Sequence, residues 1–202
     1  MNALDQTLFA AINAGSSTWG ATAWFAYIAA RYVVMLIPLH LAFLWMLGDD
    51  GVRRQALLLT YALVVAIAAS FVIGALFPTQ RPFLVPVGHH LLDHRDSPSF
   101  PSNHGLVMFT YAATMGYLRH WRHALVIGCV GLVVAWSRVY LGVHFPFDMI
   151  GALMLAVAAV GAAVMIDKVL GRRLFVLAES TYEAIVIRPL DGLLKKAGWM
   201  RD

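Results

Sequence analysis

His144 and Asp148 form the titratable pair with the clearest chemical potential in the sequence. They are four residues apart, and Phe145-Pro146 between them places proline near the first position of a predicted helix. If that turn is helical, the two side chains lie on one face. A carboxylate that binds one imidazole nitrogen fixes the tautomer and leaves the other nitrogen free to attack. The alternative interpretation is a purely structural hydrogen bond.

A second polar segment, Pro101-Ser102-Asn103-His104, precedes another apolar run. Ser102 is a suitable helix N-cap, and Pro101 stops the helix from extending backwards. The free N–H groups of a first helical turn attract anions, and His104 beside them can donate a proton. An ordinary cap with an interfacial histidine is the alternative.

Arg81 and Arg138 each end an apolar run. Guanidinium groups bind phosphate oxygens in a bidentate manner, although a single arginine at the end of a span more often reaches to the interface. Two arginines, two helix N-termini, one His–Asp pair and a second histidine together suit a phosphoryl group, because its transfer depends mainly on positioning and charge stabilisation. No metal-binding acidic cluster accompanies them in the sequence.

The composition indicates that these residues are held by membrane helices. Of the 202 residues, 60% are hydrophobic and 13% are charged, and the mean hydropathy is +0.72. A soluble domain carries about 25% charged residues, so a soluble globular fold, a disordered chain and a coiled coil are excluded. We expect an all-α integral membrane bundle of about five to six membrane helices with amphipathic terminal helices.

Four apolar runs are read directly as membrane spans: 55–80, 105–118, 124–142 and 149–166. The earlier apolar region, 18–47, contains Arg31, and a charge in mid-span is costly. We therefore expect a surface or half-inserted helix over 19–30 and a span over 32–47, with one long tilted helix as the alternative. Residues 1–14 and 172–202 are predicted to be interfacial amphipathic segments.

The basic residues orient the bundle. They cluster at Arg53-Arg54, at Arg119 and Arg122, and from Lys168 to Arg173. If the spans alternate, these clusters share one side, which the positive-inside rule makes cytoplasmic. The candidate site then faces the outer side of the membrane. Bases distributed in this way contact anionic membrane lipids and do not indicate nucleic acid binding. We expect one domain over 1–202, with a catalytic core at about 53–170 and a cytoplasmic tail at 172–202.

The motifs Arg81-Pro82, Pro101-Ser102-Asn103-His104 and Ser137-Arg138-x5-His144-x3-Asp148 resemble, in order and spacing, those of the type-2 phosphatidic acid phosphatase superfamily. Leu76-Phe77-Pro78 and Ala135-Trp136 resemble the bacterial undecaprenyl-diphosphatases of the bacitracin-resistance type.

The resemblance implies a mechanism without a metal or other cofactor. His144 would attack phosphorus to form a phosphohistidine, Asp148 would orient it, and His104 would protonate the leaving oxygen. Phosphate binding would fall to the motif residues Arg81, Pro82, Ser102, Asn103, Ser137 and Arg138. The implied substrate is a polyprenyl diphosphate, undecaprenyl diphosphate, hydrolysed to a monophosphate that re-enters the cell-wall carrier cycle.

One position departs from the family pattern. A lysine usually stands seven residues before the motif arginine, and here that residue is Gly74. We expect the missing charge to come from Arg31, with Arg95 and His94 as alternatives. His90 and His94 have a spacing that zinc ligands can adopt. A substrate-sensing or pH-responsive loop is favoured over a zinc site, and a plain solvated loop is favoured over both.

The sequence leaves the lipid open. Phosphatidylglycerol phosphate, phosphatidic acid and diacylglycerol diphosphate are alternative substrates. A non-enzymatic lipid-phosphate binding or transport protein is the more remote alternative, because binding alone does not need a poised nucleophile.

Overall fold

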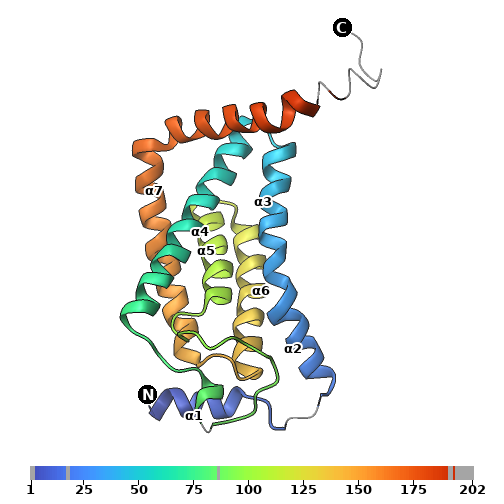
Figure 1. Ribbon diagram of the computed structural model, residues 1–202, viewed down its shortest axis with the longest axis vertical. Coiled ribbons are helices and arrows are strands. Elements are labelled where there is room, and N and C mark those ends of the chain that lie inside the picture. The colour runs from blue at the N-terminus through green and yellow to red at the C-terminus, as the bar shows by residue number, and fades with distance from the viewer. Residues whose placement is uncertain (1–2, 17–18, 86, 191–192, 194–202) are drawn as a thin grey trace. The chain divides into compact units, whose positions relative to one another are not determined.

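The computed structural model describes residues 3–16, 19–85, 87–190 and 193, and within them every regular element is helical (Figure 1). The all-α prediction is therefore confirmed. The chain divides into two compact units, residues 1–164 and residues 165–202. The first unit contains the whole candidate site and is described first.

The first unit begins with α1 (Ala3–Ile12), which is followed by α2 (Ala21–Tyr32), a 3₁₀ turn η1 (Val33–Met35) and α3 (Leu36–Leu47). Residues Ala21–Leu47 together form one apolar helical stretch of 27 residues. The prediction of a separate surface helix over 19–30 is thus wrong, and the long-helix alternative is the better description. Arg31 lies inside α2, and the 3₁₀ turn joins α2 directly to α3.

The next helices are α4 (Asp50–Leu76), α5 (Asn103–Tyr117), α6 (Trp121–Tyr140) and the first part of α7, which starts at Pro146. Asp49 caps α4 by accepting a hydrogen bond from the Val52 amide at 2.9 Å. The helix ends before Pro78, four residues short of the predicted 80, because proline disfavours helical geometry in the residue before it. A 3₁₀ turn, η2 (Pro82–Leu84), interrupts the loop between α4 and α5.

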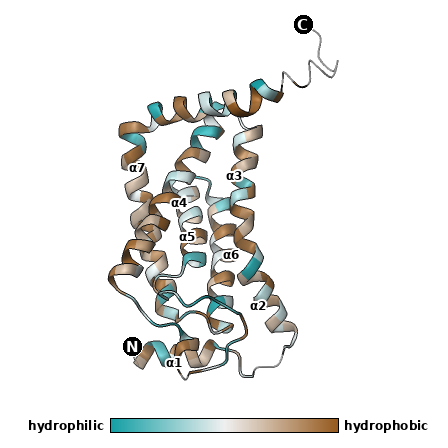
Figure 2. Cartoon of the chain, viewed as in Figure 1, coloured by the Kyte–Doolittle hydropathy of each residue, from teal (hydrophilic) through white to brown (hydrophobic). Residues whose placement is uncertain are grey.

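Four helical stretches in the described part of the chain are long and apolar enough to cross a membrane: Ala21–Leu47, Asp50–Leu76, Trp121–Tyr140 and Pro146–Leu190. Their outward side chains are large and hydrophobic, for example Leu39, Phe43, Val64 and Phe71, each more than half exposed. Apolar colour covers these outer faces (Figure 2). A water-soluble protein rarely exposes such continuous apolar surface, so the exposed face is the lipid-facing one.

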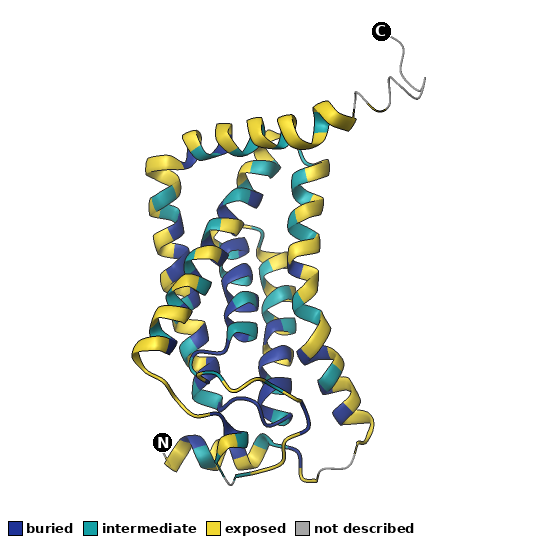
Figure 3. Ribbon diagram, viewed as in Figure 1, coloured by how far each residue is buried: buried dark blue, intermediate teal, exposed yellow. Residues whose placement is uncertain are grey.

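The short helix α5 is the most buried element of the first unit (Figure 3). It has 15 residues, which span about 22 Å at 1.5 Å per residue. That is shorter than a bilayer core, as the sequence predicted for this span. Neighbouring helices enclose it, so its polar Thr110 and Thr114 are fully buried.

Small residues allow the helices to approach closely. On α7, Ala152, Ala156, Ala159 and Ala163 recur at helical spacing and are at most 2% exposed. On α2, the buried residues are all alanines. Because lipid supplies no hydrophobic force between helices, close van der Waals contact through small residues is the main source of such packing.

The basic clusters of the first unit lie at the end of α4 that is remote from the site. The His120 ring, in the α5–α6 turn, hydrogen-bonds Gln55 near the start of α4 at 2.8 Å. This contact brings Arg53-Arg54 and Arg119 to the same end. Since α4 has 27 residues and is about 40 Å long, the loop after its other end lies across the thickness of a bilayer.

The second unit contains the remainder of α7, which ends at Tyr182, and a π-helical turn, η3 (Glu183–Ile187). Arg188 and Glu183 form an exposed ion pair at 3.8 Å. Large apolar side chains such as Val169, Leu177 and Ile185 are exposed. That residues 172–202 form an interfacial segment stays a prediction. The bases Lys195 and Lys196, on which part of that prediction rests, lie outside the described residues.

Candidate active site

The turn between α6 and α7 holds His144 in a fixed place. Gly142 adopts a positive φ of 80°, a conformation that favours glycine, and a Cβ there would lie 2.2 Å from the carbonyl oxygen of His89. The Val143 amide donates to the Arg138 carbonyl at 3.1 Å. Pro146 then begins α7 immediately after His144 and Phe145.

His144 and Asp148 pair as their spacing predicted. His144 Nδ1 lies 3.1 Å from Asp148 Oδ2, and both residues are at most 5% exposed. The same carboxylate oxygen accepts hydrogen bonds from the Ser99 hydroxyl and from the Phe145 amide. Because the carboxylate can only accept, Nδ1 carries the proton toward it, and the lone pair of Nε2 is left on the opposite side of the ring.

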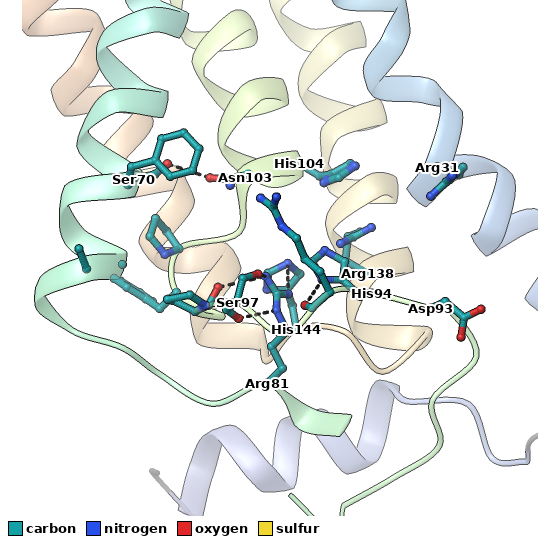
Figure 4. A pocket seen from close by; sticks show the side chains of 17 residues that line it. Arg31, Ser70, Arg81, Asp93, His94, Ser97, Asn103, His104, Arg138 and His144 are labelled. Carbon is teal, nitrogen blue, oxygen red and sulfur yellow. Dashed lines mark hydrogen bonds between the residues drawn. The ribbon is translucent and has the colours of Figure 1, made fainter. Parts of the chain in front are cut away.

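Arg81 connects the loop after α4 to the His144 turn (Figure 4). Its guanidinium donates to the carbonyl oxygens of Ser97, Pro98 and Val143 at 2.8–3.0 Å. Its Nη1 also lies 3.1 Å from His144 Nε2, so it donates to the ring nitrogen that carries the lone pair. Burial lowers the pKa of Arg81 to about 10, and the side chain is therefore still charged at neutral pH.

The environment of His144 keeps the imidazole neutral. Burial is the main cause that lowers the pKa of His144 well below its usual value, and the charges of Arg138 and Arg81 lower it further. A neutral imidazole with a fixed tautomer is the form of histidine that can act as a nucleophile, once the hydrogen bond from Arg81 to Nε2 is released.

Arg138 is the feature that most directly indicates an anion site. It is 2% exposed, yet its Nε and Nη2 atoms have no hydrogen-bond partner. Buried polar groups are nearly always satisfied, so each exception requires an explanation. An oxyanion bound in front of this guanidinium would supply the missing acceptors.

The N-terminus of α5 faces the same space, since both Asn103 and His104 line it. Ser102 caps the helix through its side chain, which accepts from the Gly105 amide. The Asn103 side chain is held by Ser70 on α4, whose hydroxyl donates to Asn103 Oδ1 at 2.8 Å. The free end of the helix is thereby directed toward the cavity, as an anion site requires.

These groups surround one cavity of about 580 Å³ (Figure 4). That volume is within the range of small-molecule sites. Of the residues that the sequence suggested for the site, the cavity is lined by His144, His104, Arg81, Arg138, Asn103 and Arg31. The structure therefore brings together side chains from α2, the α4–α5 loop, α5, α6 and the α6–α7 turn.

Four other suggested residues do not line the cavity. Asp148 lies behind His144, and Ser102 caps α5. The Ser137 hydroxyl donates to the Val134 carbonyl of its own helix, and Pro82 is buried at the start of η2. The phosphate-binding role expected for Ser102, Ser137 and Pro82 stays a prediction, since their side chains do not line the cavity.

The expectation that two helix N-termini face the anion needs a correction. The Phe147 amide, in the first turn of α7, donates to Asp5 Oδ1 of α1 at 2.9 Å. The carboxylate of Asp5 is buried and already occupies that helix end. Only the N-terminus of α5 opens on the cavity among the described helices.

Sequence reasoning assigned no role to Ser99. It is fully buried, and its hydroxyl contacts both Asp148 Oδ2 and His144 Nδ1, the latter at 3.3 Å. Its position inside the polar segment before α5 was the available signal, but no spacing rule connects residue 99 with residue 148. The contact depends on how the loop folds back on α7.

The loop histidines have separate contacts. The ring of His90 stacks on Phe83 with 4.5 Å between centroids, whereas His94 lines the cavity with its ring 6.2 Å from that of His144. Burial is the main cause that lowers the pKa of His94, to about 4. The described residues contain no group of three or more His, Cys, Asp or Glu side chains that could hold a metal ion.

Gly74, where the family lysine is missing, also lines the cavity. A Cβ at this position would come within 3.4 Å of Pro98 in the loop. The loop thus approaches α4 closely at the point where a long basic side chain would otherwise leave the helix.

The fold and the site define a class: a multi-pass helical membrane protein with a buried His–Asp pair at one end of an arginine-lined cavity. Residues 55–171 match the family described as the PAP2 superfamily. A protein of Escherichia coli (strain K12) named "Putative undecaprenyl-diphosphatase YbjG" is 35% identical over 202 residues, which cover 98% of each chain. This chain therefore belongs to the PAP2 superfamily, as the motif resemblance predicted.

Two further similarities agree with this membership. The undecaprenyl-diphosphatase BcrC of Bacillus subtilis (strain 168) is 25% identical over 127 residues, 63% of this chain and 65% of that protein. The crystal structure of Aquifex aeolicus LpxE matches with a TM-score of 0.65 and 23% identity, and covers 81% of this chain and 96% of that chain. The structural match supports the helical fold.

Proposed function

We propose that this protein is a membrane lipid-diphosphate phosphatase that hydrolyses undecaprenyl diphosphate to undecaprenyl phosphate and inorganic phosphate. The observation that carries the proposal is the unsatisfied guanidinium of Arg138 in the wall of the cavity that also contains His144. A buried cation without an acceptor, next to a neutral nucleophile, suits an electrophilic oxyanion such as a terminal phosphate. The names of the two relatives support the choice of lipid.

In the first step, His144 Nε2 attacks the terminal phosphorus. A P–N bond forms, the P–O bond of the anhydride breaks, and the leaving undecaprenyl phosphate oxygen takes a proton from His104. The bound diphosphate favours the protonated imidazole of His104 through its negative charge. Asp148 accepts the Nδ1 proton of His144 in a hydrogen bond and balances the positive charge that develops on the ring.

Arg81 has two roles in this step. With the cavity empty, its Nη1 donates to the nucleophilic nitrogen of His144. A bound phosphate offers stronger, charged acceptors, so that Nη1 moves its hydrogen bond to phosphate oxygen and frees the lone pair. Arg138 binds the remaining equatorial oxygens.

In the second step, water attacks the phosphohistidine. His104, now neutral, takes a proton from this water, the P–N bond breaks, and inorganic phosphate leaves. His144 returns to its neutral form with the proton on Nδ1. Both steps use the same oxyanion contacts, because the same three equatorial oxygens carry the charge each time.

The test is phosphate release by the purified protein in detergent with EDTA present. We expect release from undecaprenyl diphosphate at a higher kcat/KM than from phosphatidylglycerol phosphate, phosphatidic acid or diacylglycerol diphosphate. His144→Ala should abolish it, and phosphate from terminally labelled substrate should be trapped on the wild-type protein only. A phospholipid preferred over the polyprenyl diphosphate would overturn the choice of substrate. Full activity in His144→Ala would overturn the mechanism.

We also propose that the site faces the outside of a bacterial cytoplasmic membrane. The support is the separation of the site from Arg53-Arg54 and Arg119 along α4, combined with the positive-inside rule.

A further inference from the structure

Two arginines in the cavity wall take no part in the geometry around His144. Arg31 comes from α2 and Arg95 from the loop between α4 and α5, and both side chains line the cavity. Neither guanidinium has a hydrogen-bond or ion-pair partner within the part of the chain that the structure describes. Arg31 moreover lies within a candidate membrane span, where an unpaired charge is costly and usually functional.

Arg31 and Arg95 are distinct from the two arginines assigned to the reacting phosphate. Arg81 Nη1 contacts His144 Nε2 at 3.1 Å, and Arg138 is the buried guanidinium without acceptors. Within the part of the chain that the structure describes, Arg31 and Arg95 make no hydrogen bond with His144, although both line the same cavity.

The cavity wall as a whole has an excess of positive charge. Among the described residues, its lining contains four arginines, Arg31, Arg81, Arg95 and Arg138, and a single carboxylate, Asp93. The N–H groups of Arg81 already donate to three carbonyl oxygens and to a histidine ring. If Arg81 and Arg138 bound one phosphate, the guanidinium groups of Arg31 and Arg95 would still have no anion.

We infer that Arg31 and Arg95 form a second phosphate subsite, which binds the phosphate that stays on the lipid and makes the protein selective for diphosphates over monophosphates. This inference rests on the proposed function and specifies the substrate class of the same site. A lipid monophosphate would occupy only the site formed by Arg81 and Arg138. A diphosphate would also place its second phosphate at Arg31 and Arg95. It also changes the expected role of Arg31, which supports the neighbouring phosphate instead of replacing the lysine missing at Gly74.

The test compares matched lipids with the same chain, farnesyl diphosphate and farnesyl monophosphate, in detergent. Arg31→Gln and Arg95→Gln should each raise KM for the diphosphate roughly ten- to hundred-fold, the range of a lost charge-assisted hydrogen bond. Hydrolysis of the monophosphate should change less than about two-fold. Arg31→Lys should restore part of the affinity, because it keeps the charge but loses the bidentate geometry.

Arg122→Gln is the matched control, since Arg122 is an exposed arginine on α6 that does not line the cavity. It should leave both substrates unaffected. Equal losses for the two lipids in Arg31→Gln would mean that Arg31 serves the reacting phosphate, and unchanged kinetics for both would mean that it serves neither. Either result overturns the second subsite.

Calorimetric binding of inorganic pyrophosphate and phosphate separates this inference from the proposed function. If the wild-type protein hydrolyses neither lipid, the function fails, but the subsite still predicts weaker pyrophosphate binding in Arg31→Gln with phosphate binding unchanged. Equal weakening of both anions, or of neither, would overturn the subsite independently of any activity.

Discussion

At the scale of single residues, His144 depends on partners from distant parts of the chain. Asp148 fixes its Nδ1 side, Arg81 contacts its Nε2 side, and Ser99 contacts Asp148 from the loop before α5. The ring is thereby held on both sides before any substrate binds. Such preorganisation lowers the cost of aligning the nucleophile with phosphorus.

Ser99→Ala tests the partner that supports His144 through Asp148. The substitution removes one donor to Asp148, so the carboxylate orients His144 less well, and we expect kcat to fall roughly ten-fold with KM unchanged, equivalent to about 1.4 kcal/mol. The measurement is single-turnover formation of the phosphoenzyme. Ser180→Ala is the control, because that hydroxyl bonds only to Leu177 of its own helix. A changed KM with normal kcat would contradict the positioning role.

The protonation of His144 gives a pH prediction. A free histidine is half protonated near pH 6.5, but burial and the charges of Arg138 and Arg81 lower the pKa of His144 well below that value. The ring should therefore remain neutral at pH 6.5, where a free histidine is half protonated. Nitrogen chemical shifts of labelled histidines, assigned with His144→Gln, will test this, and titration near pH 6.5 would contradict it.

The same shift has a consequence for stability. Below pH 6.5 the unfolded chain binds a proton at this histidine while the folded protein does not. By linkage, the stabilisation from the neutral ring is complete above pH 6.5 and declines as the pH falls from 6.5 toward the lowered pKa.

At the scale of elements, α1 and the residue after it contact three parts of the site: the start of α7, the loop after α4 and the turn that carries His144. Its Asp5 caps the first turn of α7, and Asn13 just after the helix donates to the carbonyl oxygens of His89 and Tyr140 and accepts from the His89 amide. The loop after α4 and the turn that carries His144 are thus tied to one asparagine side chain. Apolar contacts add to this, since Phe9 packs on Phe145 with 5.2 Å between centroids.

Asn13→Ala should loosen both segments. Water can replace the exposed contacts with His89, and the Tyr140 carbonyl still accepts from the Ala14 amide at 3.0 Å. The loss of these hydrogen bonds should therefore cost about 1 kcal/mol. We expect a lower temperature of thermal inactivation in detergent and a reduced kcat. Thr7→Ala on α1 is the control, because Thr7 is exposed and bonds only within its own helix. Unchanged thermal inactivation in Asn13→Ala would show that the Asn13 hydrogen bonds are not needed to hold the turn.

The elements also show which features the sequence could predict. Apolar runs and caps predicted α4, α5, α6 and the start of α7 to within about five residues. The end of α7 was missed, because the helix continues past the predicted residue 166 to Tyr182. The spacing of His144 and Asp148 predicted their pairing, because it depends on the same helical periodicity. The contacts of Ser99, Asn13 and Asp5 could not be predicted, since each joins residues far apart in the chain. The separate helix over 19–30 was predicted wrongly, because the charge of Arg31 was expected to interrupt a span. The side chain instead lines the cavity, so the helical stretch continues to Leu47.

At the scale of the whole molecule, the hydrophobic composition and the few charges have separate roles. The first unit exposes apolar side chains to lipid and has its basic Arg53-Arg54 and Arg119 at the end opposite the candidate site. A charged diphosphate cannot cross the bilayer core without a large cost, so the side on which the cavity opens determines which pool of lipid the protein can use.

Membrane orientation can be tested by cysteine labelling, because the sequence contains one cysteine. In a Cys129→Ala background, Asp93→Cys reports the loop at the site, and Arg122→Cys reports the opposite end, where the exposed Arg122 follows the α5–α6 turn. Positive-inside orientation predicts that a membrane-impermeant maleimide labels Asp93→Cys in intact spheroplasts and labels Arg122→Cys only after permeabilisation. Preserved phosphate release in both variants ensures that folded protein is being labelled. The reverse pattern would show that the cavity opens on the cytoplasmic side. The proposed substrate would then have to enter from the inner leaflet.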